Sequence, residues 1–182
     1  PTNLITLWGL FHKSISLIYQ AKTNGLNVSS EVCPHHLLFC HNDYIKLGGL
    51  IKVNPPIRSQ DEMLLLRKYF KNKQINCFAS DHAPHLLEEK LSENYFNTPA
   101  GIPSLEFFWP LLIKAGQSSG LKLEDMIEFG ANNPANIFGF TKLGKIQEGF
   151  FASMVLLKET KTALTNRDIS AKCKWSPHLG HE

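Results

Sequence analysis

The chain has 182 residues, of which 43% are hydrophobic, enough to build the core of one ordinary folded domain. Its formal net charge is only +3 and no basic run is interleaved with aromatic residues, so nothing favours nucleic acid as a partner. The four cysteines form no Cys-x-x-Cys pair and stand in or near apolar stretches, which favours reduced thiols in a cytoplasmic protein.

The first residues predict neither a membrane anchor nor a secretion signal. Residues 4–11 are apolar but too few to span a bilayer, and they lack a basic start and a small-residue cleavage site. Apolar residues then recur at helical spacing, which predicts an amphipathic helix over 14–24, ended by Gly25. The alternating stretch 26–32 predicts a strand, after which Pro34 precedes His35 and His36.

The middle of the chain alternates extended and helical patterns. The double proline in 52–58 excludes a helix and leaves Asn54 and Arg58 as donors to an anionic ligand. Ser59 to Glu62 has the pattern of a capping box, which predicts the start of a helix whose buried face lies in 63–70. Residues 75–79 predict a buried strand, and Asp81 follows it directly.

The last third predicts helices followed by a short strand. Pro103 is expected to start a helix that runs to about Ala115, and residues 123–129 predict another. A turn at 132–134 restarts a short helix through Phe138. Glycines around the apolar run 152–157 predict β-structure outside the main sheet.

Ionisable side chains are concentrated where the two predicted strands end. Asp81, His82 and His85 follow the strand at 75–79, and His35 and His36 follow the strand at 26–32. A carboxylate at the carboxyl end of a parallel strand lies on the face where a (β/α)₈ barrel gathers its chemistry. The density of such groups indicates a metal or acid/base site. The alternative is an ordinary turn, in which the Asp81 side chain bonds nearby backbone N–H groups.

Five segments together resemble a known family. They are 31–37, 53–59, 78–90, 99–106 and 174–177. In order and spacing they are similar to the carboxyl-terminal part of the dihydroorotases, members of the amidohydrolase superfamily. The resemblance implies an α/β fold. Residues 1–142 would be the C-terminal portion of a (β/α)₈ TIM-like barrel, and 143–182 the remnant of a small β-sandwich domain with a C-terminal segment.

The resemblance implies a zinc-dependent hydrolase that reversibly converts dihydroorotate to N-carbamoyl-L-aspartate in pyrimidine biosynthesis. Asp81 would bind the metal and act as the catalytic acid/base, taking a proton from the attacking water and passing it to the leaving nitrogen. Substrate contacts would come from Asn54, His85 and the backbone of Ala100 and Gly101.

Other histidines receive supporting roles. His35 and His36 match family positions that are not metal ligands, so we expect them to be structural or to support the site. His82 is expected to orient its loop.

The resemblance also implies ligands that this chain lacks. The family's His-x-His pair and bridging carboxylate lie on barrel strands with no counterpart here. Its histidine on the sixth strand aligns with Trp8, which cannot bind zinc. If the chain is about one helical turn shorter than the family at this point, His12 takes that position instead. A hydrolytic zinc site takes about three protein ligands. We therefore expect the isolated chain not to turn over dihydroorotate.

Three interpretations follow. In the first, the chain contributes Asp81, Asn54 and His85 to a dihydroorotase, either as an incomplete fragment of a longer enzyme or with the missing strands supplied by another polypeptide or by a homo-oligomer. In the second, it is a catalytically inactive, dihydroorotase-like structural partner. Within the enzyme class, the alternative is a related allantoinase or hydantoinase/dihydropyrimidinase. His85 favours dihydroorotate, because it would meet the carboxylate that neutral rings lack.

Overall fold

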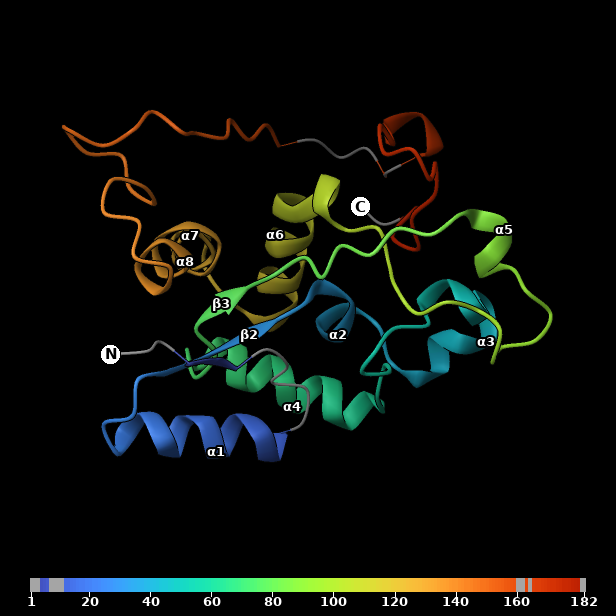
Figure 1. Cartoon of the computed structure of the whole chain (residues 1–182), viewed down its shortest axis with the longest axis horizontal. Coiled ribbons are helices and arrows are strands. Elements are labelled where there is room, and N and C mark those ends of the chain that lie inside the picture. The colour runs from blue at the N-terminus through green and yellow to red at the C-terminus, as the bar shows by residue number, and fades with distance from the viewer. Residues whose placement is uncertain (1–3, 7–11, 160–162, 164, 181–182) are drawn as a thin grey trace.

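The computed structural model describes residues 4–6, 12–159, 163 and 165–180. Its sheet has three parallel strands in the order β1 (Leu4–Thr6), β2 (Val28–Val32) and β3 (Cys77–Phe78), shown in Figure 1. Leu4 pairs with Val28, and Glu31 pairs with Cys77. Because the strands are parallel, the segments that follow β2 and β3 leave the sheet at the same edge.

Eight helices are described along the chain. They are α1 (His12–Thr23), α2 (Pro34–Leu38), α3 (Tyr44–Leu47), α4 (Gln60–Lys71), α5 (Leu87–Lys90), α6 (Phe108–Ser119), α7 (Leu123–Ile127) and α8 (Asn133–Ile137). Short 3₁₀ turns lie at His41–Asp43, Gly48–Ile51, Leu105–Phe107 and Asn166–Asp168, and a π-helical turn at Glu128–Asn132.

The hydrophobic core lies between the sheet and the longer helices. Helix α1 packs on β2 and α4, and α4 packs in turn on α6. Their apolar side chains meet those of the strands in one buried cluster. It includes six side chains that are at most 3% exposed: Ile15, Val32, Leu66, Phe70, Phe78 and Leu112. Burying a side chain of this size contributes about 1.5–3 kcal/mol, so this cluster fixes the positions of the strand ends.

Most predicted helices are confirmed, but one begins later than expected. The helices predicted at 14–24 and after Ser59 are α1 and α4. The helix expected from Pro103 instead begins with a 3₁₀ turn at 105–107 and continues as α6 to Ser119. The proline that α6 accepts is Pro110, which stands in its first turn, where the backbone N–H has no helical partner.

The strand expected at 152–157 was a wrong prediction. Residues 151–159 have no regular secondary structure. A strand is stable only beside a hydrogen-bonded neighbour, and within the described residues no segment pairs with this one. Met154, Val155 and Leu156 are therefore left 65%, 60% and 98% exposed.

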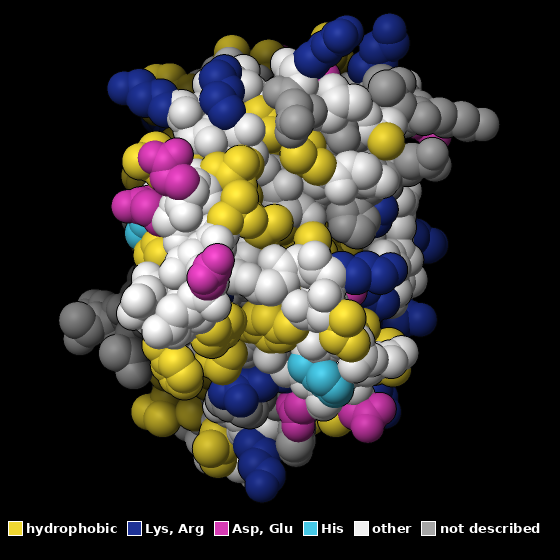
Figure 2. Space-filling model, turned by 90° about the vertical axis from the view of Figure 1, so that its right-hand side faces the viewer, with side chains coloured by type: hydrophobic (Ala, Val, Ile, Leu, Met, Phe, Trp, Pro, Cys, Tyr) yellow, Lys and Arg dark blue, Asp and Glu magenta, His cyan; other side chains and the backbone are white. Residues whose placement is uncertain are grey.

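Hydrophobic side chains are also exposed on the side of the molecule where α3 and α5 lie. Figure 2 shows this side, with apolar side chains spread between charged ones. Ile45 on α3 is 87% exposed, and Phe96, after α5, is 89% exposed.

In the described part of the chain, no helix has the length and apolar character needed to cross a membrane.

Candidate active site

Asp81 lies just beyond the carboxyl end of β3, as the sequence predicts. Its backbone has a φ of 45°, in the left-handed region that Asp adopts more readily than most residues. The side chain is 31% exposed, and burial raises the pKa of its carboxyl group above the usual value. A partly desolvated carboxyl group at this edge of the sheet is suited to accept and return a proton.

His35, at the start of α2, lies against Asp81. Its Nε2 is 3.7 Å from Oδ2 of Asp81, and the histidine is fully buried. Burial, followed by the nearby His36 and His178, lowers the pKa of His35 well below its usual value. The imidazole is therefore neutral at pH 7, and 3.7 Å exceeds a hydrogen-bond length. The contact leaves the charge of Asp81 without a counterion on this side.

His36 connects α2 to the double-proline segment. Its Nε2 lies 3.0 Å from the carbonyl oxygen of Pro55. A carbonyl only accepts, so Nε2 must carry the hydrogen and Nδ1 the lone pair. Burial lowers the pKa of His36 to about 4. Asn54 is exposed and precedes Pro55 through a cis peptide bond, so the predicted substrate contact stands next to this anchor.

His85, Ala100 and Gly101 form a second group. Nε2 of His85 lies 3.2 Å from the carbonyl oxygen of Ala100, and the N–H of Gly101 donates to the carbonyl of Lys52 at 2.9 Å. Gly101 has a φ of 150°, and a Cβ there would stand 2.5 Å from the carbonyl oxygen of Ala83. The close approach of the two loops therefore requires glycine at this position.

Histidine 82 holds the same loop, as expected. Its Nδ1 accepts hydrogen bonds from the backbone N–H groups of Ser104 at 3.1 Å and Leu105 at 3.2 Å. His82 and Ile102 also form a parallel β-bridge. These contacts place the segment after Gly101 beside the segment after β3.

Lys90 supports this second group and was given no role by the sequence. It is 1% exposed, and its Nζ donates to the carbonyls of Lys52, Pro99 and Gly101 at 3.1, 2.9 and 2.9 Å. Burial, with a smaller effect of Lys52, lowers the pKa of Lys90 to about 8. Only its place in the 78–90 segment signalled it, because lysine is ordinarily a surface residue.

The indole of Trp175 completes the support under this group. Its Nε1–H donates to the carbonyl oxygen of His85 at 2.7 Å, and its ring lies 5.8 Å from Nζ of Lys90. Within the described residues, no hydrogen bond or ion pair joins Asp81 directly to Asn54 or His85. The expected site residues thus fall into two groups on neighbouring loops.

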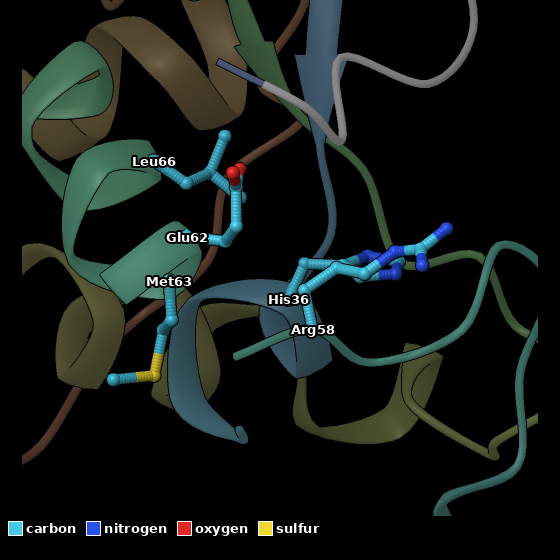
Figure 3. Close-up of a pocket in the computed structure, with 5 residues that line it drawn as sticks. All are labelled: His36, Arg58, Glu62, Met63 and Leu66. Atoms are coloured by element: carbon cyan, nitrogen blue, oxygen red, sulfur yellow. The ribbon is translucent and has the colours of Figure 1, made fainter. Parts of the chain in front are cut away.

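A small pocket lies on the α4 side of His36. Figure 3 shows its lining, in which Arg58 extends alongside His36. Helix α4 contributes the other three side chains, Glu62, Met63 and Leu66. The pocket includes Arg58, a predicted donor to an anionic ligand, but none of Asn54, His85, Ala100 and Gly101. It is therefore separate from the expected active site.

Metal-ligating side chains also gather beside Asp81. One ligand atom each from Cys33, His35 and His36 lies within 4.8 Å of the other two. The resemblance implied that His35 and His36 are not metal ligands, and no metal role was predicted for Cys33. Trp8 and the side chain of His12, considered above as the sixth-strand ligand, lie outside the described residues.

Solved structures define the class of fold. An L-hydantoinase (dihydropyrimidinase) from Arthrobacter aurescens matches 98% of this chain with a TM-score of 0.86 and 29% identity, and the chain covers 41% of it. A dihydroorotase from Saccharomyces cerevisiae, solved with 5-fluoroorotic acid, matches 76% of the chain with a TM-score of 0.67 at 20% identity, and the chain covers 39% of it. The fold is that of the amidohydrolases.

Curated relatives narrow the class. The chain is 36% identical to a dihydroorotase of Archaeoglobus fulgidus over 158 residues. This alignment covers 86% of this chain and 37% of the relative. It is 38% identical over 145 residues to a dihydroorotase of Ehrlichia canis, covering 79% of this chain and 32% of the relative. An allantoinase of Bacillus velezensis is 32% identical over 169 residues, covering 93% of this chain and 37% of the relative.

These matches confirm the resemblance that the sequence segments indicated, and the chain belongs to the dihydroorotase family. The chain spans 32–37% of the length of the curated relatives described above. No family model matches it.

Proposed function

We propose that this chain is the carboxyl-terminal part of a dihydroorotase-like cyclic amidohydrolase, which reversibly hydrolyses dihydroorotate to N-carbamoyl-L-aspartate in pyrimidine biosynthesis. Residues 1–142 supply the last part of a (β/α)₈ barrel, and 143–182 the remnant of the small β-sandwich domain. The observation that carries the proposal is the half-buried carboxyl group of Asp81 at the carboxyl end of β3, with its raised pKa. Its free cysteines favour a cytoplasmic location.

Asp81 suits one ligand position of a zinc centre, because it is a partly buried carboxylate whose neighbour His35 is neutral. When bound, zinc supplies a water molecule of lowered pKa. Asp81 accepts the proton of the attacking water and delivers it to the ring nitrogen as the amide bond breaks. The remaining ligands come from a further segment or a partner chain, since three or so are needed.

The second group of residues holds the substrate. Together with the exposed amide of Asn54 on the neighbouring double-proline segment, the backbone of Ala100 and Gly101 provides hydrogen bonds to the ring, for which the Gly101 N–H must leave the Lys52 carbonyl. His85 stands beside Ala100 and binds the substrate carboxylate. Because Nε2 of His85 contacts the Ala100 carbonyl and Nδ1 lies 3.9 Å from Oε2 of Glu89, this binding requires the ring to rotate.

Turnover in a completed barrel tests the function. A chimaera joins the preceding barrel strands of a related dihydroorotase to this chain, and its rate of dihydroorotate hydrolysis is measured. We expect activity, its loss by at least about 100-fold in Asp81→Asn, and normal activity in Asp61→Asn, an exposed control on α4. A folded but inactive chimaera, or an active Asp81→Asn variant, rejects the proposal.

His85 tests the substrate class in the same chimaera. Replacing His85 by Ala removes the group that faces the carboxylate, so KM for dihydroorotate should rise by about tenfold or more while KM for an uncharged dihydropyrimidine changes little. Equal effects on both substrates would favour the hydantoinase or allantoinase alternative. The similarity to the Arthrobacter aurescens L-hydantoinase and the Bacillus velezensis allantoinase is the reason for this alternative.

A further inference from the structure

Cys33, His35 and His36 form a buried cluster that has no part in the proposed hydrolysis. Their exposed fractions are 9%, 0% and 5%. Their ligand atoms already lie within 4.8 Å of one another. Bonds of about 2.0–2.3 Å to a tetrahedral ion separate its ligands by about 3.3–3.8 Å. Side-chain movements of about 1 Å therefore suffice to bring these three atoms around one ion.

Three of the four ring nitrogens in this cluster have no hydrogen-bond partner among the described residues. They are both nitrogens of His35 and Nδ1 of His36, and all three are buried. Unpaired buried polar atoms are uncommon in folded proteins, and an ion or an ordered water is a frequent reason for them. Two adjacent histidines with this property point to a ligand between them and the Cys33 thiol.

The tautomer of His36 fits metal binding. Its Nε2–H donates to the Pro55 carbonyl, which leaves the lone pair on the buried Nδ1. Metal-binding histidines almost always donate their other ring N–H to a carbonyl or carboxylate, which fixes the ring. Asp81, 3.7 Å from His35, adds a negative charge at the edge of the cluster that favours a cation.

We propose that Cys33, His35 and His36 bind one borderline-soft transition-metal ion, with Zn²⁺ the expected species. One thiolate and two imidazoles form a donor set that zinc accepts, and the fourth position is open to water. As the metal–sulfur bond forms, the thiol proton passes to solvent. The site does not rest on the proposed hydrolysis, which assigns its metal to Asp81 and to ligands outside this cluster.

Titration of the whole chain with Co²⁺ tests the site. Cobalt bound by a thiolate gives a near-ultraviolet charge-transfer band, and we expect one Co²⁺ per chain with this band, displaced by Zn²⁺. The band should be lost in Cys33→Ser and weakened in His35→Asn. It should persist in Cys173→Ser, a control thiol outside the cluster, and in His41→Asn, an exposed control imidazole. Circular dichroism verifies that each variant folds.

The unmodified chain provides a second measurement if Cys33→Ser does not fold. X-ray absorption of the zinc-loaded chain should show one sulfur at about 2.3 Å and nitrogens at about 2.0–2.1 Å. A shell of oxygen and nitrogen alone, no thiolate band in the unmodified chain, or a band unchanged in Cys33→Ser would overturn the proposal. Its failure is distinguishable from failure of the hydrolase proposal, because a metal held by Asp81 without sulfur gives turnover and no thiolate band.

Discussion

Lys90 places an ammonium group where solvent scarcely reaches it. The lowered pKa, near 8, corresponds to a cost of about 3 kcal/mol for keeping the side chain charged at pH 7. Hydrogen bonds from a charged donor contribute about 1.5–3 kcal/mol each, and Lys90 makes three. The three hydrogen bonds offset part of this desolvation cost, and through them Lys90 holds the Gly101 loop against Lys52.

Replacing Lys90 by Met should lower the free energy of unfolding by about 2 kcal/mol. The substitution removes the desolvation cost, but it leaves the carbonyls of Pro99 and Gly101 buried without a donor, at about 1–3 kcal/mol each. Urea denaturation at pH 7 measures the change. Lys46→Met, at an exposed position of α3, is the matched control and should change stability by less than about 0.5 kcal/mol. Equal effects of the two substitutions would show that the carbonyl contacts contribute nothing.

His36 makes stability depend on pH in the acid range. Its pKa is about 4 in the folded chain, against about 6.5 when unfolded, so the unfolded chain binds the extra proton between these values. Stability from this group is complete above pH 6.5 and falls as the pH drops to 4, by about 3 kcal/mol. Urea midpoints at pH 7 and pH 4.5, measured without metal, should therefore differ less in His36→Gln than in the unmodified chain. An unchanged difference would contradict this origin.

At the scale of single elements, α4 shows how far local sequence fixes structure. Ser59 caps this helix, and its Oγ accepts a hydrogen bond from the N–H of Glu62 at 3.3 Å. Acidic Asp61 and Glu62 occupy the first turn and Lys68 and Lys71 the last, as the helix dipole favours. Each of these features lies within a few residues of the next, so the sequence alone predicts them.

Ser59→Ala should destabilise the chain by about 1 kcal/mol, because one backbone donor at the start of α4 loses its acceptor. Thermal or urea unfolding followed by circular dichroism measures the loss. Ser118→Ala, at an exposed position inside α6, should be neutral or slightly stabilising, since alanine is the better helix former. A matching loss in both variants would show that the cap is not formed.

Contacts between elements that are far apart in the chain could not be predicted from the sequence. Asp81 could be placed at a strand end because its strand precedes it directly. The hydrogen bonds of Lys90 join residues up to 38 positions apart, and no local sequence pattern indicates that Lys90 is buried. The strand expected at 152–157 failed for the same reason, because pairing depends on a neighbour elsewhere in space and not on the apolar run itself.

At the scale of the whole molecule, large apolar side chains remain exposed outside the hydrophobic core. The extended segment after α8 passes through Phe151, Val155 and Leu156 without burying them. Unpaired extended backbone with apolar side chains is a ready template for pairing with another chain. We therefore expect this segment to drive self-association of the isolated protein.

Leu156→Lys tests this expectation, because Leu156 is 98% exposed and contributes almost nothing to the packing of its own chain. The substitution should lower concentration-dependent association in sedimentation or light scattering, and leave the free energy of unfolding within about 0.5 kcal/mol. Ile45→Lys is the matched control, since Ile45 is 87% exposed but lies on helix α3, where the backbone hydrogen bonds are made within the helix. If both substitutions reduce association equally, exposed apolar area alone is responsible. A decrease confined to Leu156→Lys assigns the contact to the unpaired segment.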